Sequence, residues 1–563
     1  MPRGNLNLIW SRALFAELIR GGVREAVICP GSRSTPLALA AAEVLPLRTA
    51  LDERSGAFLA LGAAKALQAP AVVLCTSGSA GAHFYPALLE AEASGIPLIA
   101  LTADRPPELH GFGAPQTLDQ QRLFGGHVRF FADLGVPSLA GFPQLRALAA
   151  RAAREPGPSH LNAPFREPLA PIEEELESTP DAHPAALLRE ERSGPDVCET
   201  GPMLRRRGAI VCGPRDAEDG LSAAVAELSR ALGWPVIAEP GSQVRGGVAY
   251  ADLILRSPVW ARALQPEVIL RIGGSTTSRL VQAWADTASQ IVVHERGELI
   301  DPAHRAQLVL RGDAPALCRA LTAARRADPT LASAGRAAPG PGAQLALWRE
   351  AERRVAGALE SAFSRGELSE PFAARAVLQA VPQGGQLFVS SSMPIRDLDA
   401  FGGPAGVRVL CNRGVNGIDG QVSTAAGAAL ATGRATFALV GDVALLHDLG
   451  GLIAAARLHA DLTVVCVNND GGGIFHFLPV AEHAEPTRFE ELFGTPHGMD
   501  LQGAALLCGA SFLRCTTAPA LREALRHPAA GLRLIEVRTD RADNLKQHRA
   551  LQAEALGALG EPP

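Results

Sequence analysis

Short apolar segments alternate with helical stretches along almost the whole chain, and this alternation limits the possible folds more than any other feature. In the first third, apolar segments at 25–30, 71–76 and 97–104 are separated by helical patterns at about 54–68 and 78–94. Strands that alternate with helices in this way form βαβ units, whose strands run parallel in one sheet. The pattern therefore predicts an α/β fold built on parallel sheets.

The same alternation returns twice, after two segments with the composition of linkers. Residues 173–202 are charged and interrupted by proline, and residues 327–343 are rich in Ala, Pro and Gly. A chain of 563 residues has room for about three or four domains. We therefore expect three doubly wound parallel-sheet domains, at 1–180, 203–330 and 344–563.

Charge and cysteine content exclude several classes of protein. The net charge is −5 and the pI about 6.3, which disfavours nucleic acid or an anionic membrane as a partner. The cysteines are scattered and form no CxxC pair, which favours a reducing, cytoplasmic location and argues against a zinc site. No apolar stretch is long enough to predict a membrane span.

Lysine is nearly absent from this chain. Lysine and arginine together number 53, of which only Lys65 and Lys546 are lysines. A genomic preference for arginine explains the count, but the chemical consequence is the same. The sequence has no GxxxxGK[ST] phosphate loop, and a Schiff-base enzyme would have to use one of these two lysines. Anionic substrates must be held by guanidinium groups, which bind carboxylates well.

Two apolar segments of the last third end in residues suited to a metal ion. Asp442 follows the first, and Asn469 follows the second after a spacing of 27 residues, with glycines at 471–473. Adjacent parallel strands would place both side chains at one sheet edge. Carboxylate, amide and backbone oxygens suit Mg²⁺ bound to a diphosphate, and glycine lets the backbone approach phosphate closely. The alternative is that Asp442 caps a helix and the glycines form a turn.

Polar residues also follow the strands of the first third. Glu53 stands after a short apolar segment at the start of a helix, where an ordinary first-turn charge is the alternative. The segment with Ser32 and Arg33 precedes another helix and forms a candidate anion site, although a helix cap by Ser34 or Thr35 would explain the hydroxyl groups.

Five arginines follow predicted strands in different parts of the chain. Each alone would be read as a surface residue, but together they indicate one or two substrates that carry several carboxylates. They are Arg33, Arg105, Arg279, Arg396 and Arg413.

These residues stand in motifs that resemble a known enzyme family. The pair GDV and VNNDGG is similar to the thiamine diphosphate–Mg²⁺ motif, with Val443 where a third glycine is usual. The more specific motifs resemble the 2-succinyl-5-enolpyruvyl-6-hydroxy-3-cyclohexene-1-carboxylate synthases of the menaquinone pathway, over nearly the whole chain. They are PGSRSTPL, DERS, TSGSA, LTADRPPEL, NRGVNGIDG, STAAG and NNDGGGIFHFLP.

The resemblance implies an architecture and a reaction. The first domain would bind the pyrimidine ring of thiamine diphosphate, the middle one would be a degenerate Rossmann-like domain, and the last would bind the diphosphate and Mg²⁺ (or Mn²⁺). The cofactor would lie between two subunits of an obligate homodimer or a dimer of dimers. The enzyme would decarboxylate 2-oxoglutarate and add the resulting succinyl carbanion to isochorismate in a conjugate (1,4) addition.

The resemblance also implies roles for individual residues. Glu53 would hydrogen-bond the aminopyrimidine ring, and Asp442, Asn469 and the Gly471 carbonyl would bind the metal. The other residues implied to contact the cofactor are Gly31, Ser77, Gly78, Ile418, Gly441, Gly473, Ile474 and Phe475. Those implied to surround the substrates are Ser32, Arg33, Arg105, Gln116, Arg279, Ser392, Arg396 and Arg413.

Two positions depart from the family pattern. Ser278 stands where the family often has lysine, and Pro115 stands where some members have asparagine, so both bear on substrate affinity.

The alternative function is another thiamine diphosphate-dependent 2-oxoacid carboligase or decarboxylase, although unpaired arginines around an apolar substrate would be costly. A nucleotide-binding protein of the NAD type would need a GxGxxG fingerprint after a strand, which is absent.

Overall fold

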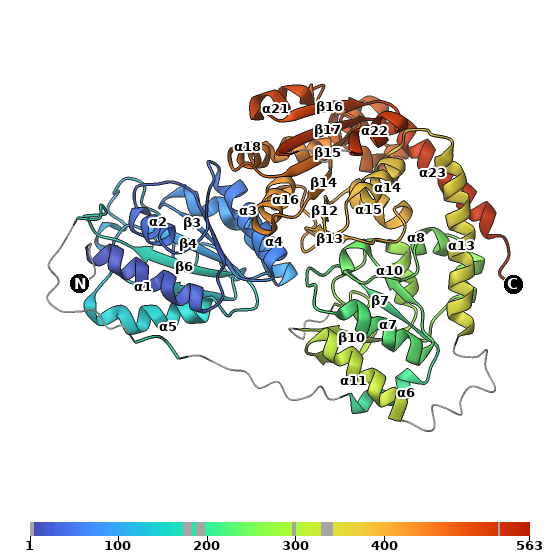
Figure 1. The fold of residues 1–563 in the computed structure, drawn as a ribbon, viewed down its shortest axis with the longest axis horizontal. Coiled ribbons are helices and arrows are strands. Elements are labelled where there is room, and N and C mark those ends of the chain that lie inside the picture. The colour runs from blue at the N-terminus through green and yellow to red at the C-terminus, as the bar shows by residue number, and fades with distance from the viewer. Residues whose placement is uncertain (1–4, 173–182, 187–196, 296–299, 328–341, 527–529) are drawn as a thin grey trace.

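The computed structural model describes the whole chain except residues 1–4, 173–182, 187–196, 296–299, 328–341 and 527–529. Three parallel β-sheets, each flanked by helices, follow one another along the chain (Figure 1). The predicted α/β fold class with three parallel-sheet units is therefore confirmed. The parts of the two expected linkers at 173–182, 187–196 and 328–341 lie outside the described residues.

The first sheet has six strands in the order β2-β1-β3-β4-β6-β5, all parallel. Its central strands β1, β3 and β4 are fully buried and mostly apolar, as the sequence predicts. The strands are β1 (Glu25–Ile28), β2 (Leu47–Thr49), β3 (Ala71–Cys75), β4 (Leu98–Asp104), β5 (Phe130–Asp133) and β6 (Ser159–Pro164). The helices are α1 (Leu6–Arg20), α2 (Thr35–Ala42), α3 (Glu53–Leu67), α4 (Tyr85–Ser94) and α5 (Phe142–Ala152).

The middle sheet has five parallel strands in the order β11-β10-β9-β7-β8. The strands are β7 (Gly208–Cys212), β8 (Val236–Ala238), β9 (Val268–Ile272), β10 (Ser289–His294) and β11 (Ala306–Arg311). The helices are α6 (Gly201–Leu204), α7 (Leu221–Leu232), α8 (Ala251–Leu255), α9 (Pro258–Ala263), α10 (Arg279–Ala285) and α11 (Ala314–Ala327). The long helix α13 (Ala343–Ser364) then runs from this part of the molecule to the third sheet (Figure 1).

The third sheet repeats the pattern of the first, with the order β13-β12-β14-β15-β17-β16. The strands are β12 (Gln386–Val389), β13 (Arg408–Cys411), β14 (Thr436–Gly441), β15 (Leu462–Asn468), β16 (Ser511–Cys515) and β17 (Leu532–Arg538). The helices are α14 (Glu370–Ala380), α15 (Met393–Phe401), α16 (Gln421–Thr432), α17 (Asp442–His447), α18 (Leu449–Arg457), α19 (Val480–His483), α20 (Pro486–Phe489), α21 (Leu501–Cys508), α22 (Ala518–Leu525) and α23 (Arg541–Leu559).

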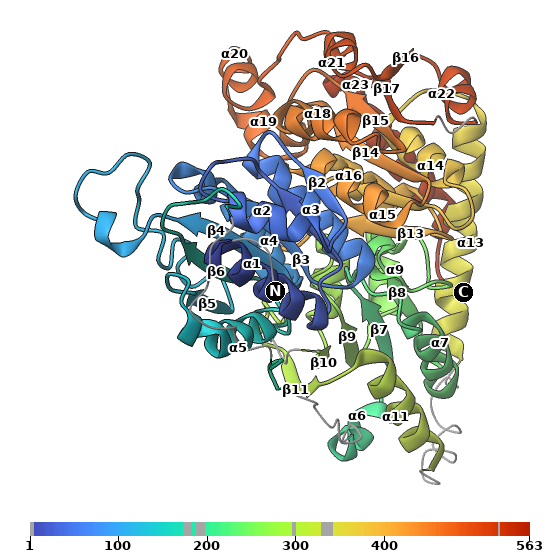
Figure 2. The ribbon, with the colours of Figure 1, turned by 60° about the vertical axis from the view of Figure 1, so that its left-hand side comes forward.

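The first and third sheets are joined by a close contact between α3 and α16. A Cβ atom on Gly62 would lie 2.0 Å from the carbonyl oxygen of Thr424, and one on Gly427 would lie 2.0 Å from that of Leu59. The two glycines therefore let the helix backbones approach each other directly. One buried hydrophobic cluster runs through this contact and includes residues of both sheets. In Figure 2 the first-sheet region lies against the third at α3.

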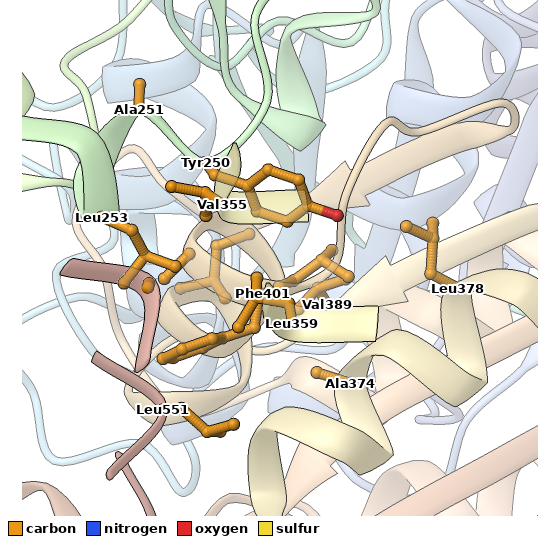
Figure 3. Close-up of a cluster of buried hydrophobic side chains, with 14 of the residues drawn as sticks. Tyr250, Ala251, Leu253, Val355, Leu359, Ala374, Leu378, Val389, Phe401 and Leu551 are labelled. Atoms are coloured by element: carbon orange, nitrogen blue, oxygen red, sulfur yellow. The ribbon is translucent and has the colours of Figure 1, made fainter. Parts of the chain in front are cut away.

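A second hydrophobic cluster joins the middle and third sheets. Figure 3 shows Tyr250 and Leu253, beside and within α8, packed close to Leu359 of α13 and Phe401 of α15. Both clusters include residues of the third sheet, so the third sheet packs against the first sheet on one hand and the middle sheet on the other. Among the described residues, no helix is both long and apolar enough to cross a membrane.

Candidate active site

Strands β14 and β15 are hydrogen-bonded neighbours, and the residues that follow them lie at the same edge of the third sheet. Gly441 is paired with Val467 at the end of the ladder. Asp442 and Asn469 come immediately after these strands and are both buried. The predicted juxtaposition of the two side chains is therefore present, because parallel strands bring their carboxyl ends together.

The Asp442 carboxylate is held by hydrogen bonds on both oxygens. Oδ1 accepts the backbone N–H of Val443 over 2.7 Å, and Oδ2 accepts that of Gly471 over 2.9 Å. Asp442 is the first residue of α17 but does not cap it, because Gly441 is the N-cap residue and no side chain caps this helix. Burial raises the pKa of Asp442, although the N–H groups of Gly471 and Val443 oppose the shift. A cation beside this carboxylate would favour its charged form.

The amide nitrogen of Asn469 is hydrogen-bonded, but its amide oxygen is not. Its Nδ2 donates to Oε1 of Glu370, the first residue of α14, over 2.8 Å. Its Oδ1 is buried and has no hydrogen-bond partner. An unsatisfied buried oxygen is costly unless a ligand completes it. Glu370 was not among the predicted site residues, because its sequence context is that of an ordinary charge in the first turn of a helix.

The backbone after Asn469 forms a turn that excludes side chains. Gly471 has a φ of +136°, and a Cβ atom there would lie 2.0 Å from the carbonyl oxygen of Gly494. A Cβ on Gly472 would lie 2.2 Å from the carbonyl oxygen of Phe493. Only glycine fits this path, which brings bare backbone to the rim of the site.

These residues line a pocket of about 220 Å³ at the edge of the third sheet. All of its lining residues lie between Glu370 and Thr495. The predicted site residues among them are Ser392, Ile418, Gly441, Asp442, Asn469, Gly471, Gly473, Ile474 and Phe475. The pocket lining therefore includes oxygen-bearing side chains, glycine backbone and apolar side chains.

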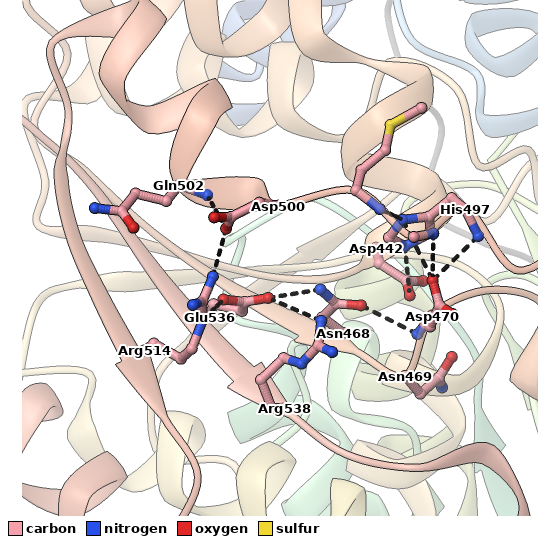
Figure 4. A network of polar contacts seen from close by, with 12 residues as sticks. Asp442, Asn468, Asn469, Asp470, His497, Asp500, Gln502, Arg514, Glu536 and Arg538 are labelled. Carbon is pink, nitrogen blue, oxygen red and sulfur yellow. Dashed lines mark hydrogen bonds and ion pairs between the residues drawn. The ribbon is translucent and has the colours of Figure 1, made fainter.

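A histidine that the sequence analysis missed closes the outer side of the Asp442 carboxylate. His497 Nε2 lies 3.2 Å from Asp442 Oδ2, and its backbone N–H donates to Oδ1 of Asp470 over 3.1 Å. Figure 4 shows His497 between Asp442 and Asp470. His497 follows no strand, so strand-end reasoning did not select it.

The sequence matches three families that together cover most of the chain. Residues 10–123 match "Thiamine pyrophosphate enzyme, N-terminal TPP binding domain", residues 195–389 match "Middle domain of thiamine pyrophosphate", and residues 407–537 match "Thiamine pyrophosphate enzyme, C-terminal TPP binding domain". The Asp442–Asn469 pocket lies in the region from the end of the second match through the third.

Full-length relatives show which family of thiamine pyrophosphate enzymes the chain resembles. A 2-succinyl-5-enolpyruvyl-6-hydroxy-3-cyclohexene-1-carboxylate synthase from Myxococcus xanthus is 51% identical, with 99% of each chain covered. Synthases of the same name from Thermobifida fusca and Chloroflexus aurantiacus are 43% and 41% identical, each over 98% of this chain and at least 97% of their own. The chain belongs to this synthase family of thiamine diphosphate-dependent enzymes.

Three of the five arginines predicted to bind substrate lie near one another, between the middle and third sheets of this synthase-family chain. Arg279 begins α10, Arg396 lies in α15, and Arg413 follows β13. Burial lowers the pKa of Arg396, and the positive charges of Arg413 and Arg279 lower it further. An anionic ligand bound by all three guanidinium groups would offset their mutual repulsion. Ser278, where a lysine is expected in the family, caps α10 and donates to Asp252 over 2.7 Å.

A second group of predicted residues gathers at the edge of the first sheet. Arg105 donates to the hydroxyl of Ser77, and Gln116 Nε2 donates to the Ser77 carbonyl over 2.9 Å. Arg33 is close enough to Arg105 to lower its pKa, after the larger effect of burial. Arg33 also donates to the carbonyl of Phe165 over 3.0 Å.

The glycines of this edge allow its loops to pack closely. A Cβ on Gly31 would lie 2.2 Å from Cβ of Thr76, and one on Gly78 would lie 2.8 Å from Cγ of Gln116. Ser32 in the same loop is exposed. The hydroxyls of Ser34 and Thr35 donate to the carbonyls of Gly31 and Ser32 and cap no helix N–H, so the simple capping alternative is wrong.

Glu53 begins α3 at the contact between the first and third sheets. The preceding residue, Asp52, caps this helix by accepting the N–H of Ser55 over 3.0 Å. Burial raises the pKa of the Cys29 thiol, and the nearby charge of Glu53 raises it further, which places the carboxylate at the end of β1. Glu53 does not line the Asp442–Asn469 pocket of its own chain.

Proposed function

We propose that the Asp442–Asn469 pocket binds the diphosphate of thiamine diphosphate through Mg²⁺ or Mn²⁺. The metal ligands in this proposal are an Asp442 oxygen, the unpartnered Oδ1 of Asn469 and the carbonyl of Gly471. The proposal is supported by that buried, unbonded oxygen and by the glycine backbone beside it. Magnesium takes few protein ligands and completes its coordination with phosphate and water, which fits one carboxylate and one amide.

The apolar side of the pocket would hold the thiazolium ring and the reacting carbon. Ile418 is proposed to support the bent cofactor, and Ile474 and Phe475 to shield the reacting carbon from water. Thiamine diphosphate supplies a nucleophilic carbon that adds to a 2-oxoacid and takes up the electron pair released with CO₂. The backbone around Gly441 and Gly473 would face the diphosphate.

The proposed reaction decarboxylates 2-oxoglutarate and adds the remaining four-carbon unit to isochorismate in a conjugate addition. The product is the compound after which the full-length relatives are named, an intermediate of menaquinone biosynthesis. This full-length relation at 51% identity is the observation that carries the proposal.

The two arginine groups match the two substrates in number and charge. The cluster of Arg279, Arg396 and Arg413 stands next to the pocket residue Ser392, whose carbonyl accepts a hydrogen bond from Arg396. Guanidinium groups bind carboxylates through paired hydrogen bonds, so each group would hold carboxylates in register with the reacting carbon. The second group would comprise Ser32, Arg33, Arg105 and Gln116, with Ser77, Gly78 and Gly31 shaping the loops beside the cofactor.

The complete site requires two subunits in this proposal. Glu53 is proposed to hydrogen-bond the aminopyrimidine ring, yet it does not line the diphosphate pocket of its own chain. An obligate homodimer, or a dimer of dimers, would supply Glu53 from one subunit to the pocket of the other.

The proposed domains are a pyrimidine-binding part at 1–180, a middle part at 203–330 and a diphosphate-binding part at 344–563. A cytoplasmic location is also proposed, and it is supported by the free state of eight described cysteines.

A comparison of donor substrates tests the proposed reaction. The purified chain is supplied with thiamine diphosphate, Mg²⁺, isochorismate and one of three donors: 2-oxoglutarate, pyruvate or glyoxylate. Mass spectrometry should detect the succinylated product only with 2-oxoglutarate. A product formed from pyruvate in its place would support a different carboligase of the superfamily.

Subunit mixing tests the shared site. The single variants Glu53→Gln and Asp442→Ala should each be inactive, because each damages a different half of both sites. After subunit exchange, mixed dimers should contain one intact site and regain activity. A mixture that exchanges subunits but stays inactive would contradict a site shared between subunits.

A further inference from the structure

One of the two lysines lies at the point where the three sheets meet. Lys65, in α3, is 1% exposed. Its Nζ lies 3.2 Å from Oδ2 of Asp216 in the loop after β7, 3.6 Å from Oε1 of Glu90 in α4, and 3.0 Å from the carbonyl oxygen of Cys411 at the end of β13. An ammonium group has three N–H donors on one small atom, and three acceptors surround it here. Arginine would place a much larger planar group in the same space.

Glu90 continues this cluster to the loop after β13. Its Oε1 accepts the backbone N–H of Gly414 over 3.0 Å, and its Oε2 accepts that of Val415 over 2.9 Å. Glu90 is 1% exposed, so the carboxylate that accepts both bonds is shielded from water. A Cβ on Gly414 would lie 2.7 Å from the Ser94 hydroxyl and 2.9 Å from Glu90 Oε2, which shows how closely the loop lies on α4.

These bonds bracket Arg413 on both sides. Lys65 binds the carbonyl of Cys411, two residues before Arg413, and Glu90 binds the N–H groups of the two residues after it. Lys65 is one cation held between two carboxylates, those of Asp216 and Glu90. Burial would lower the pKa of Lys65, but Asp216 and Glu90 outweigh that effect and raise it, so the lysine is cationic.

We infer that the Lys65–Glu90 pair is a positioning device for the proposed reaction, which fixes the backbone on either side of Arg413 and so aims its guanidinium group at a substrate carboxylate. The inference rests on the proposed role of Arg413. A displacement of a binding group by about 1 Å can lower a rate a hundredfold, so a rigid buried support is functionally significant. Buried charges that lose their partner are costly, which is why the pair can hold the loop firmly.

A double-mutant cycle tests the inference. The variants are Glu90→Gln, Arg413→Ala and the combination of both, with kcat/KM for 2-oxoglutarate and for isochorismate as the readout. If Glu90 acts through Arg413, Glu90→Gln should lower kcat/KM for a carboxylate substrate by about tenfold or more, and should add little to the loss in the Arg413→Ala background. Thiamine diphosphate affinity, measured by calorimetry, should not change, because Glu90 does not line the cofactor pocket.

Two outcomes separate this inference from the proposed function. Wild-type kcat/KM in Arg413→Ala would contradict the proposed role of Arg413 itself. A normal rate in Glu90→Gln, or losses that multiply in the double variant, would overturn the positioning role alone. If Glu90→Gln does not fold, Gly414→Ala serves instead, since its Cβ would displace the loop from α4 without removing a buried charge. A normal kcat/KM in Gly414→Ala would then overturn the inference.

Two controls are matched to these variants. Lys546→Met removes the other lysine, whose ion pair with Asp543 is exposed, and should leave kcat/KM unchanged. Arg375→Met removes a buried cation that pairs with Glu360 and bonds Tyr250, without contact to the loop after β13. It should lower stability but not substrate affinity. A fall in kcat/KM as large as that of Glu90→Gln would show that the effect comes from general destabilisation, and would overturn the inference.

Discussion

Glu370 Oε1 accepts a hydrogen bond from Nδ2 of Asn469 over 2.8 Å, and this bond sets the direction of the Asn469 amide. Thr539 donates to the same oxygen of Glu370 over 3.1 Å. With its nitrogen bonded to Glu370, Asn469 keeps a buried, unbonded oxygen, and both Asn469 and Asp442 line the pocket. Glu370 is thus a support for a proposed metal ligand, a kind of residue that commonly affects metal affinity.

Glu370→Gln is expected to weaken metal binding. Glutamine can present an NH₂ group to Asn469, which lets the amide turn and withdraw its oxygen from the metal. We expect the Mg²⁺ concentration needed for thiamine diphosphate binding to rise about tenfold, measured by calorimetry. Glu536→Gln is the matched control, because Glu536 accepts a bond from the neighbouring Asn468 over 2.6 Å (Figure 4). Equal effects of both variants would contradict a specific role for Glu370.

Asp442→Ala is expected to abolish Mg²⁺-dependent binding of thiamine diphosphate. The substitution removes the only carboxylate among the three proposed ligands, and Mg²⁺ depends on charged oxygen ligands. Titration of the cofactor into the purified variant, with and without Mg²⁺, gives the affinity directly. An affinity equal to that of the wild type would refute the metal site.

Glu53→Gln is expected to stop catalysis while leaving the fold intact. Glutamine keeps the shape of the side chain but loses its charge, so the proposed contact to the aminopyrimidine ring no longer promotes proton transfer. We expect kcat to fall by about 10²-fold or more. Circular dichroism should be unchanged, because Glu53 lies at a helix start whose cap is supplied by Asp52. Near-normal turnover would contradict the proposed role of Glu53.

The central strands could be predicted from the sequence, and several outer ones could not. Strands such as β3 and β15 are mostly apolar segments because both of their faces are buried. The prediction missed β5, β6, β11 and β16. β11 and β16 are edge strands with exposed residues, so their composition resembles that of loops.

Strand β6 escaped prediction for a different reason. Its buried residues include His160 and Asn162, which bond the Thr102 hydroxyl of β4 over 2.8 Å and 2.9 Å. A polar side chain in a core is stable only when a distant partner satisfies it, and the local sequence does not show that partner.

The site was predictable where it followed strand ends, and not where distant segments meet. Asp442 and Asn469 could be placed because each follows an apolar strand. Glu370 is 99 residues from Asn469 in sequence, and His497 is 55 from Asp442, so neither contact leaves a local pattern. The role of Lys65 likewise depends on packing among all three sheets.

His160 is expected to make the protein sensitive to mild acid. Burial lowers the pKa of His160 to about 3, below its ordinary value of 6.5. Because the folded pKa is the lower one, the stability is fully present above pH 6.5 and is lost as the pH falls toward 3. Between pH 7 and pH 5 the loss should be about 2 kcal/mol. Urea unfolding of the wild type and of His160→Gln should differ in pH dependence by this amount, and parallel curves would contradict it.

The fate of the carbon atoms of 2-oxoglutarate tests the central claim most directly. The enzyme, with thiamine diphosphate, Mg²⁺ and isochorismate, is given 2-oxoglutarate labelled at its first or its second carbon, and the product and CO₂ are analysed by mass spectrometry. We predict that the first carbon leaves as CO₂, one for each product molecule, and that the second is retained in the product as the carbon joined to the ring. Loss of the second carbon as CO₂, or a product that keeps the first carbon, would contradict the account.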